Sequence, residues 1–122
     1  MLLLILALPL RAGVYESLEA CCGEAQGGLI VRLPIHDVAP FDGLVLPCDA
    51  EDVNARIVYV KLPDSDRSIR LEFSEADYNR LHPFDRVRFN LNGCKVRKDP
   101  ETGAIQVSNV MPGHILFIDD SK

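Results

Sequence analysis

Hydrophobic and polar residues alternate along short runs of the chain from about residue 28 onward. The clearest runs are Ser68–Phe73 and Asp85–Asn92, in which every second residue is apolar. A period of two places successive side chains on opposite faces of a β-strand, so each run predicts a strand with one buried face. The side chains expected to point inward are Ile69, Leu71 and Phe73 in the first run and Val87, Phe89 and Leu91 in the second.

Other runs of strand character are separated by residues that favour turns. Gly93 allows a sharp bend, after which the second of the clear strands resumes as Cys94–Arg97. Pro63–Asp66 and Asp99–Gly103 are turn sequences of the kind that join hairpins. The remaining predicted strands of the barrel are Asp42–Leu46, Arg56–Leu62 and Ala104–Val110. Gly28–Ile35 has Pro34 near its end, which suits an edge or a bend more than a central strand, and His114–Ile118 is a last short run.

Between the two clearest strands the pattern changes to one typical of a helix. Ser74 is a suitable N-cap residue, and acidic residues follow it in the first turn, where the helix dipole favours them. Tyr78 and Leu81 are three positions apart and can face the sheet together, and Pro83 ends the element. We therefore predict a helix of barely two turns from Ser74 to Leu81.

Three strands, a short helix and two more strands predict an all-β fold with one short helix. This order within roughly 90 residues is that of the OB fold, a five-stranded, partly open Greek-key barrel. The helix would close one end of the barrel, and closure would remove exposed sheet edges. We assign residues 28–118 to a single OB-like domain. The alternative is a plain β-sandwich, which needs no helix at this point.

Residues 1–20 predict a leader segment for export. Met1–Leu10 is uncharged and apolar, too short to span a bilayer but long enough for the core of a secretory signal, although no positive charge precedes it. Cleavage could follow Ala12, or it could precede Cys21, which would then be a lipid anchor as in a bacterial lipoprotein. Either site predicts a location in the periplasm or on the outer membrane. The alternative is a buried first strand or helix of a cytosolic protein.

The four cysteines, at positions 21, 22, 48 and 94, do not have the spacing of a zinc site. In an oxidising compartment Cys48 and Cys94 could form a disulfide. The alternative is that both are small buried apolar residues. Cys21 and Cys22 are adjacent and could not comfortably bridge each other.

Charge is distributed unevenly along the chain, whose net charge is −5. Residues 1–64 hold four Lys and Arg against nine Asp and Glu, whereas residues 65–122 hold nine of each. The acidic balance argues against a dedicated nucleic-acid-binding protein. The cations of the second half either belong to an ordinary solvated surface or gather in a basic patch, whose members would be Arg70, Arg86, Arg88, Lys95, Arg97 and Lys98.

Sequence motifs for catalysis, phosphate binding or dinucleotide binding are absent. His36 and Asp37 resemble a base and its orienting group, but no serine or cysteine is placed by sequence to use them. Two acidic loops, 49–52 and 64–66, lack the ligand spacing of a calcium-binding EF-hand. We therefore predict a non-enzymatic protein that holds no metal or cofactor.

Ile69–Gly93 resembles part of a known domain family. It contains a strand that enters a short helix with Tyr78, a connection over Leu81–Asp85, and a strand that ends on Gly93. This layout is similar to that of the OB-like domain of exported Bacteroidota cell-envelope lipoproteins, domain of unknown function 5689. The resemblance covers about half of the mature chain and implies an exported, non-enzymatic domain.

These features predict a binding or structural module of the bacterial cell envelope, whose partner is a protein or a glycan. The alternative is a single-stranded nucleic-acid-binding protein, because OB barrels use their second and third strands to stack bases on aromatic side chains. Tyr59 is the one aromatic residue of the hairpin that could be exposed and serve as such a platform; the alternative is that it belongs to the core or to a partly buried barrel wall. The residues expected on the ligand face are Tyr59, Lys61, Arg70, Arg86 and Arg88.

Overall fold

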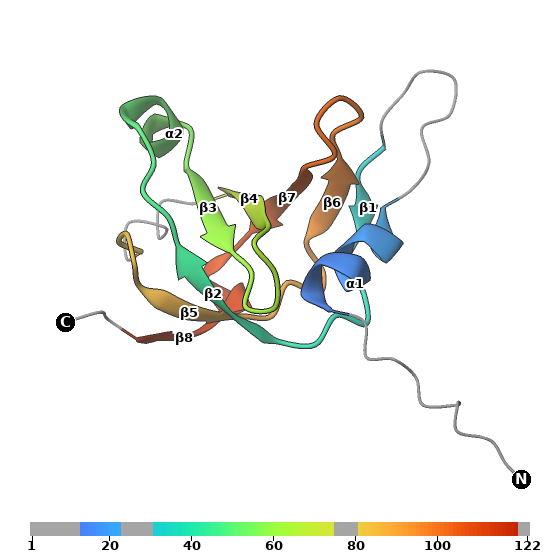
Figure 1. Cartoon of the computed structure of the whole chain (residues 1–122), viewed down its shortest axis with the longest axis horizontal. Coiled ribbons are helices and arrows are strands. Elements are labelled where there is room, and N and C mark those ends of the chain that lie inside the picture. The colour runs from blue at the N-terminus through green and yellow to red at the C-terminus, as the bar shows by residue number, and fades with distance from the viewer. Residues whose placement is uncertain (1–12, 23–30, 75–80, 120–122) are drawn as a thin grey trace, which may run out of the picture.

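The computed structural model describes residues 13–22, 31–74 and 81–119, which form a curved β-sheet with two short α-helices (Figure 1). Within these residues the sheet has eight strands. The helices are α1 (Val14–Cys21) and α2 (Ala50–Asn54), and a 3-10 turn, η3 (Pro112–His114), precedes the last strand. The strands are β1 (Leu33–Pro34), β2 (Phe41–Val45), β3 (Ile57–Lys61), β4 (Ser68–Phe73), β5 (Arg86–Phe89), β6 (Lys95–Lys98), β7 (Ile105–Val110) and β8 (Ile115–Asp119).

The strands lie in the order β1-β6-β7-β4-β3-β2-β5-β8. Among the described strands only β4 and β7 run parallel, and the other neighbouring pairs are antiparallel. The two ends of the sheet, β1 and β8, are not paired with each other within the described residues, so the sheet is not closed there. The predicted all-β class is confirmed. The predicted count of five strands is exceeded, because one predicted strand divides at Gly93 and two edge strands, β1 and β8, join the sheet.

Gly93 lies in the connection between β5 and β6, where one predicted strand divides. Gly93 has a φ of 95°, which glycine adopts without the steric cost that a side chain would add. On one side of it β5 pairs with β2, and on the other β6 pairs with β7. A single stretch of chain therefore contributes to two distant parts of the sheet.

The core lies on the inner side of the curved sheet, where the alternating pattern predicted it. All six side chains expected to point inward from the two clearest runs are buried. Phe89 is fully buried on β5, and its ring lies 5.7 Å from that of Phe41 on β2. Most of the predicted helix from Ser74 to Leu81 lies outside the described residues.

Helix α1 belongs to the folded unit, which corrects the predicted boundary. Tyr15, Leu18 and Cys21 are buried in the same hydrophobic cluster as the strands. The Tyr15 hydroxyl donates a hydrogen bond to the carbonyl oxygen of Gly103 at 3.0 Å. The domain therefore begins before residue 28, and a leader that ended at Ala20 would remove part of its core.

Gly43 on β2 gives a first test of this packing. A Cβ atom added at Gly43 would lie 2.2 Å from Cγ1 of Val60, and valine cannot swing its branched side chain away freely. We expect Gly43→Ala to lower the free energy of unfolding by about 1–3 kcal/mol, measured by urea denaturation. Gly113→Ala is the control, because no atom lies within 4 Å of its added Cβ. Equal effects of the two substitutions would contradict the close approach of β2 and β3.

Candidate functional site

One row of outward-facing residues crosses the sheet at right angles to the strands. The backbone nitrogen of Leu46 donates to the carbonyl oxygen of Tyr59 at 2.9 Å, and Tyr59 lies opposite Arg70. Arg70 lies opposite Gln106, which lies opposite Arg97. Their neighbours along the strands, such as Val60, Leu71 and Val107, are buried in the core, so the row faces outward. We call this set the outer row: Leu46, Tyr59, Arg70, Gln106 and Arg97.

Arginine side chains concentrate at one end of the outer row. The Nε of Arg97 donates to Oε1 of Gln106 at 2.6 Å. Arg32, just before β1, forms an ion pair at 3.8 Å with Glu72 on β4, although β6 and β7 lie between these strands. Neighbouring strands are about 4.8 Å apart, so this pair reaches over roughly 14 Å of the outer face. We call Arg32, Arg70 and Arg97 the arginine cluster.

Arg70 is the member of the cluster that is available to a ligand. No hydrogen bond or ion pair joins its side chain to another described residue. Arg32 and Arg97 already contact Glu72 and Gln106, and Lys95 adds a further cation, opposite Ser108. Three arginines, one lysine and one glutamate leave an excess of positive charge on this face of an acidic protein.

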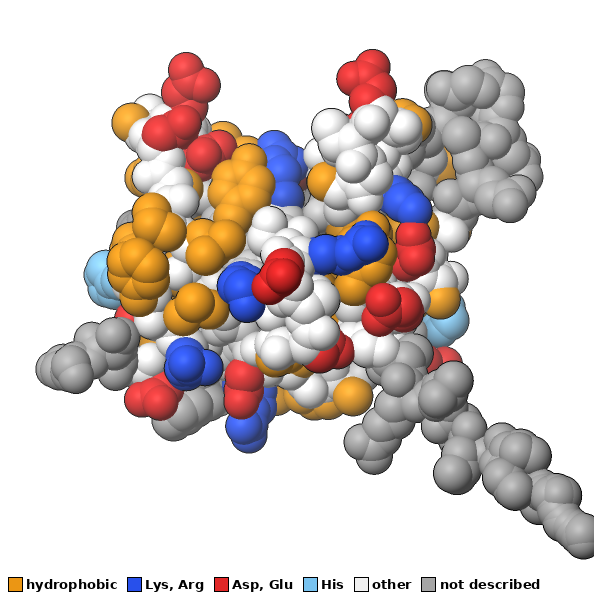
Figure 2. Space-filling model, viewed as in Figure 1, with side chains coloured by type: hydrophobic (Ala, Val, Ile, Leu, Met, Phe, Trp, Pro, Cys, Tyr) orange, Lys and Arg blue, Asp and Glu red, His pale blue; other side chains and the backbone are white. Residues whose placement is uncertain are grey.

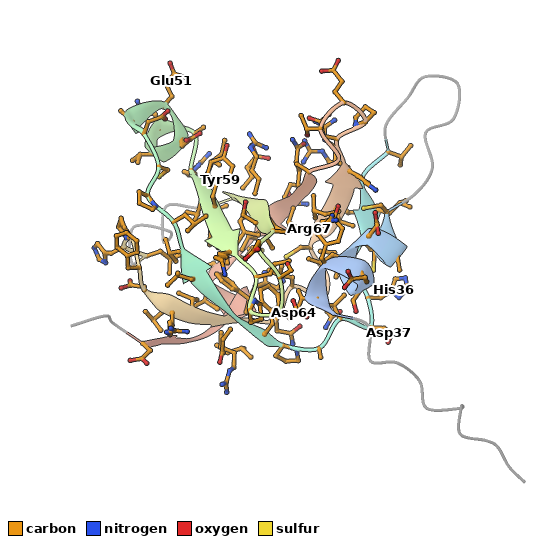
Figure 3. All side chains as sticks on the ribbon, viewed as in Figure 1. His36, Asp37, Glu51, Tyr59, Asp64 and Arg67 are labelled. Carbon is orange, nitrogen blue, oxygen red and sulfur yellow. The ribbon has the colours of Figure 1, made fainter. Side chains whose placement is uncertain are left out.

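Acidic residues occupy the two projections beside this face. Figure 2 shows Asp and Glu side chains at both tips, which Figure 1 identifies as α2 and the β6–β7 turn, and Figure 3 labels Glu51 at the outer end of α2. Asp49 caps α2 by accepting from the backbone nitrogen of Asp52 at 3.0 Å. In the turn, the backbone nitrogen of Glu101 donates to Asp99 and holds the pKa of that carboxyl below its usual value. These tips would repel a long polyanion and leave room for a few anionic groups between them.

Hydrophobic side chains gather at the opposite end of the outer row (Figure 2). They surround a hollow of about 190 Å³ at the ends of β2 and β3, beneath α2. The inner surface of the hollow is formed by Val45 and Val58 of the core. We call the residues around it the apolar corner: Leu46, Cys48, Val53, Leu81 and Pro83.

The structure brings part of the predicted ligand face together and separates the rest. Tyr59 and Arg70 are direct neighbours, and Figure 3 shows Tyr59 on β3. Lys61 follows on the same face of β3, and together with Leu44 and Arg86 it lines a separate hollow of about 280 Å³. Each of these predicted residues is therefore on the outer face, but they form two groups.

Arg88, the fifth predicted residue, is occupied by an ion pair. Its Nε and Nη2 atoms donate to the two carboxylate oxygens of Asp42 at 2.7 and 3.2 Å. This hydrogen bonding raises the pKa of Arg88 and lowers the pKa of Asp42. The guanidinium group of Arg88 therefore already binds a carboxylate of the same sheet, whereas that of Arg70 has no such partner among the described residues.

The cysteines are free thiols in the structure. Cys48 is exposed beside α2 and Cys94 is fully buried, so the predicted disulfide is not formed. Burial raises the pKa of the Cys94 thiol to about 12, which keeps it protonated near neutral pH. Cys21 is buried and donates from Sγ to the carbonyl oxygen of His36 at 3.3 Å. A lipid anchor at Cys21 would require the loss of this contact and of the rest of α1.

His36 and Asp37 contact each other at 3.3 Å, and both side chains are exposed. The nearby thiol of Cys21 contacts the backbone of His36 and not its ring. In the described part of the chain, no group of three or more His, Cys, Asp or Glu residues could hold a metal ion.

Arg32, Leu46 and Gln106 were not among the residues predicted for the ligand face. Arg32 lies in the predicted first strand, and Gln106 is an outward position of the predicted strand 104–110. Their alternation with buried neighbours could have assigned them to an outer face. Only the strand order could show that β6, β7 and β4 are neighbours and that these residues meet.

No family model, curated protein or solved structure matches the chain. The resemblance to the cell-envelope OB-like family therefore stays a prediction. Across residues 13–22, 31–74 and 81–119, no helix has the length and apolar character required to cross a membrane.

Proposed function

We propose that this protein is a non-enzymatic binding module of OB type, which binds carboxylate groups of a protein partner at the arginine cluster. The proposal rests on one observation: Arg70 lies without a described partner between Tyr59 and Gln106, on a face that Arg32 and Arg97 also reach. Guanidinium groups bind carboxylates through paired, charge-assisted hydrogen bonds.

Strand pairing supports the OB-type architecture. β2, β3 and β4 follow one another as antiparallel neighbours, and β7 returns parallel to β4. The stretch that contains β5 and β6 then pairs with β2 through one half and with β7 through the other. OB barrels bind ligands on their second and third strands, between the loops that here contain α2 and the β6–β7 turn. The outer row crosses this same surface.

The acidic tips favour a protein partner over a polyanion. A partner segment can place one or two carboxylates over the arginine cluster and basic or neutral residues against α2 and the β6–β7 turn. A nucleic acid has a negative charge at every phosphate and would meet the acidic tips as well. We also propose that the module acts at the cell envelope, which rests on the apolar Met1–Leu10 segment and on cleavage after Ala12, just before α1.

A second candidate function, single-stranded nucleic-acid binding, has one observation in its favour. Tyr59 is partly exposed beside Arg70, an arrangement that can stack a base and neutralise its phosphate. Tyr59 is the only aromatic residue of the outer row, whereas binding of several bases requires several such platforms. We therefore place this function second.

The test compares Arg70→Gln with Arg88→Gln, which removes the same charge from an ion-paired arginine of the same sheet. A short fluorescein-labelled oligoglutamate peptide is the probe, and fluorescence anisotropy at low salt is the measurement. We expect Arg70→Gln to weaken binding about tenfold or more, because a hydrogen bond to a charged group contributes about 1.5–3 kcal/mol. Arg88→Gln should change it little.

Two outcomes would contradict this function. One is equal binding by the wild-type protein and Arg70→Gln; the other is no binding by the wild-type protein. Labelled oligodeoxythymidylate is measured in parallel. If it binds more tightly than the acidic peptide and loses affinity in Tyr59→Ala, the second candidate function replaces the first.

A further inference from the structure

Phe84 adopts a backbone conformation that a phenylalanine rarely takes. Its φ is 72°, in the left-handed region that favours glycine. The backbone nitrogen of Asp85 donates to the carbonyl oxygen of His82 at 3.1 Å, so Pro83 and Phe84 are the central residues of a tight turn. A turn with proline first and a positive φ second ordinarily has glycine at the second position. The chain has a bulky aromatic residue there instead.

Phe84 is 54% exposed, so burial of its side chain contributes little to the stability of the fold. Two backbone hydrogen bonds join this turn to Val45 on β2. The backbone nitrogen of Phe84 donates to the carbonyl oxygen of Val45 at 2.7 Å, and the backbone nitrogen of Val45 donates to the carbonyl oxygen of Asp85 at 2.9 Å. Phe84 and Asp85 therefore both lie opposite the single residue Val45. This is a β-bulge, which changes the direction of a side chain. The stability of the fold therefore does not explain why a phenylalanine occupies this strained position, and strained residues are common at binding sites.

Phe84 adjoins the apolar corner, which is itself open to solvent. Pro83, its neighbour in the turn, lines the 190 Å³ hollow together with Leu46 and Val53. Val53 is 42% exposed, so two large hydrophobic side chains stand at this end of the sheet. A hydrophobic patch beside a hollow is typical of a site that binds another protein.

The apolar corner continues directly into the arginine cluster. Leu46 belongs to both the corner and the outer row, and Tyr59 separates it from Arg70. The outer row therefore changes from apolar to cationic over two strand spacings, about 10 Å. A matching ligand has a hydrophobic group and, at this distance, a negative charge.

We propose that Phe84 and the apolar corner anchor a hydrophobic side chain of a protein partner, whose acidic residues lie on the arginine cluster. The acidic half of this inference rests on the proposed function. The positive charge of the arginine cluster selects a partner segment with acidic residues. An extended segment rises about 3.3 Å per residue, so these acidic residues lie about three to six residues from the hydrophobic one. That range corresponds to the two to four strand spacings from Leu46 to Arg70 and Arg97.

Selection from a random peptide library displayed on phage tests this inference on the full chain. We expect the enriched peptides to have a hydrophobic residue separated by about three to six positions from acidic residues. Phe84→Gly should weaken binding of a selected peptide about tenfold or more, as expected for an aromatic anchor. Glycine suits the positive φ, so this variant should also have an unfolding midpoint no lower than that of the wild-type protein. Leu116→Ala, at an exposed hydrophobic residue of β8, is the control and should bind normally.

The result separates this inference from the proposed function. Phe84→Gly should still bind short oligoglutamate as the wild-type protein does, because the arginine cluster is unchanged. The anchor role of Phe84 would be contradicted if Phe84→Gly bound the selected peptides as tightly as the wild-type protein, or if the enriched peptides lacked the paired hydrophobic and acidic residues. Neither result would contradict carboxylate binding by the arginine cluster. The same conclusion follows if Arg70→Gln loses oligoglutamate binding while Phe84→Gly binds every tested peptide as the wild-type protein does.

Discussion

Replacement of Phe89 by alanine is expected to lower the free energy of unfolding by about 3–5 kcal/mol. Phe89 is fully buried on β5, which lies between β2 and the edge strand β8. Its ring packs against Phe41, so truncation would remove hydrophobic contacts and leave a cavity. A loss of this size is a large part of the stability of a small domain.

Urea denaturation monitored by circular dichroism measures this change. Leu116→Ala is the matched control, since it removes a large hydrophobic side chain that is 51% exposed at the edge of the sheet. We expect the control to change the free energy of unfolding by less than about 0.5 kcal/mol. A change under about 1 kcal/mol for Phe89→Ala would mean that Phe89 does not point into the core.

The strands could be predicted because their signal is local. In Ser68–Phe73, for example, the alternation of apolar and polar residues has the same bounds as β4, and a turn sequence precedes it. The inner face follows directly from that alternation. The number of strands does not, because the division at Gly93 and the addition of the edge strands β1 and β8 depend on pairing with distant segments.

Helix α1 was missed because its burial depends on residues far along the chain. Tyr15 contacts Gly103, and Lys98 forms an ion pair with Glu19, so the helix is held by the β6–β7 region. Arg67 places its guanidinium 4.1 Å from the centre of the Tyr15 ring and holds the helix from a second side. None of these contacts appears in the local sequence, whereas the uncharged, apolar Met1–Leu10 segment favoured the prediction of a leader.

The candidate site shows the same limit. The pattern could place Tyr59, Arg70 and Arg97 on outer faces, but it could not show which strands are neighbours. Because β7 lies parallel to β4 and separates it from β6, two arginines of different hairpins join one row. Phe84 was missed for a different reason: glycine at this position would have indicated a positive φ, but phenylalanine gives no such signal.

Removal of residues 1–20, which cleavage before Cys21 would cause, is expected to abolish cooperative folding. The truncation deletes Leu18, which is fully buried, and Tyr15, and it exposes the strands that α1 covers. Loss of one such leucine contact costs about 2–5 kcal/mol, and loss of both side chains approaches the whole stability of a small domain. Urea denaturation followed by circular dichroism measures the effect.

Removal of residues 1–12 is the matched control, because it leaves every described contact of α1 in place. The backbone nitrogen of Val14 donates to Asp64 at 3.0 Å, so a chain that begins at Gly13 retains the attachment of the helix. Leu18→Ala in the full chain separates loss of packing from loss of length, and it should lower the free energy of unfolding by about 2–5 kcal/mol. Equal unfolding midpoints for the two truncations would show that α1 contributes nothing to the core. A folded protein after the shorter removal and an unfolded one after the longer would leave Ala12 as the cleavage site compatible with this fold.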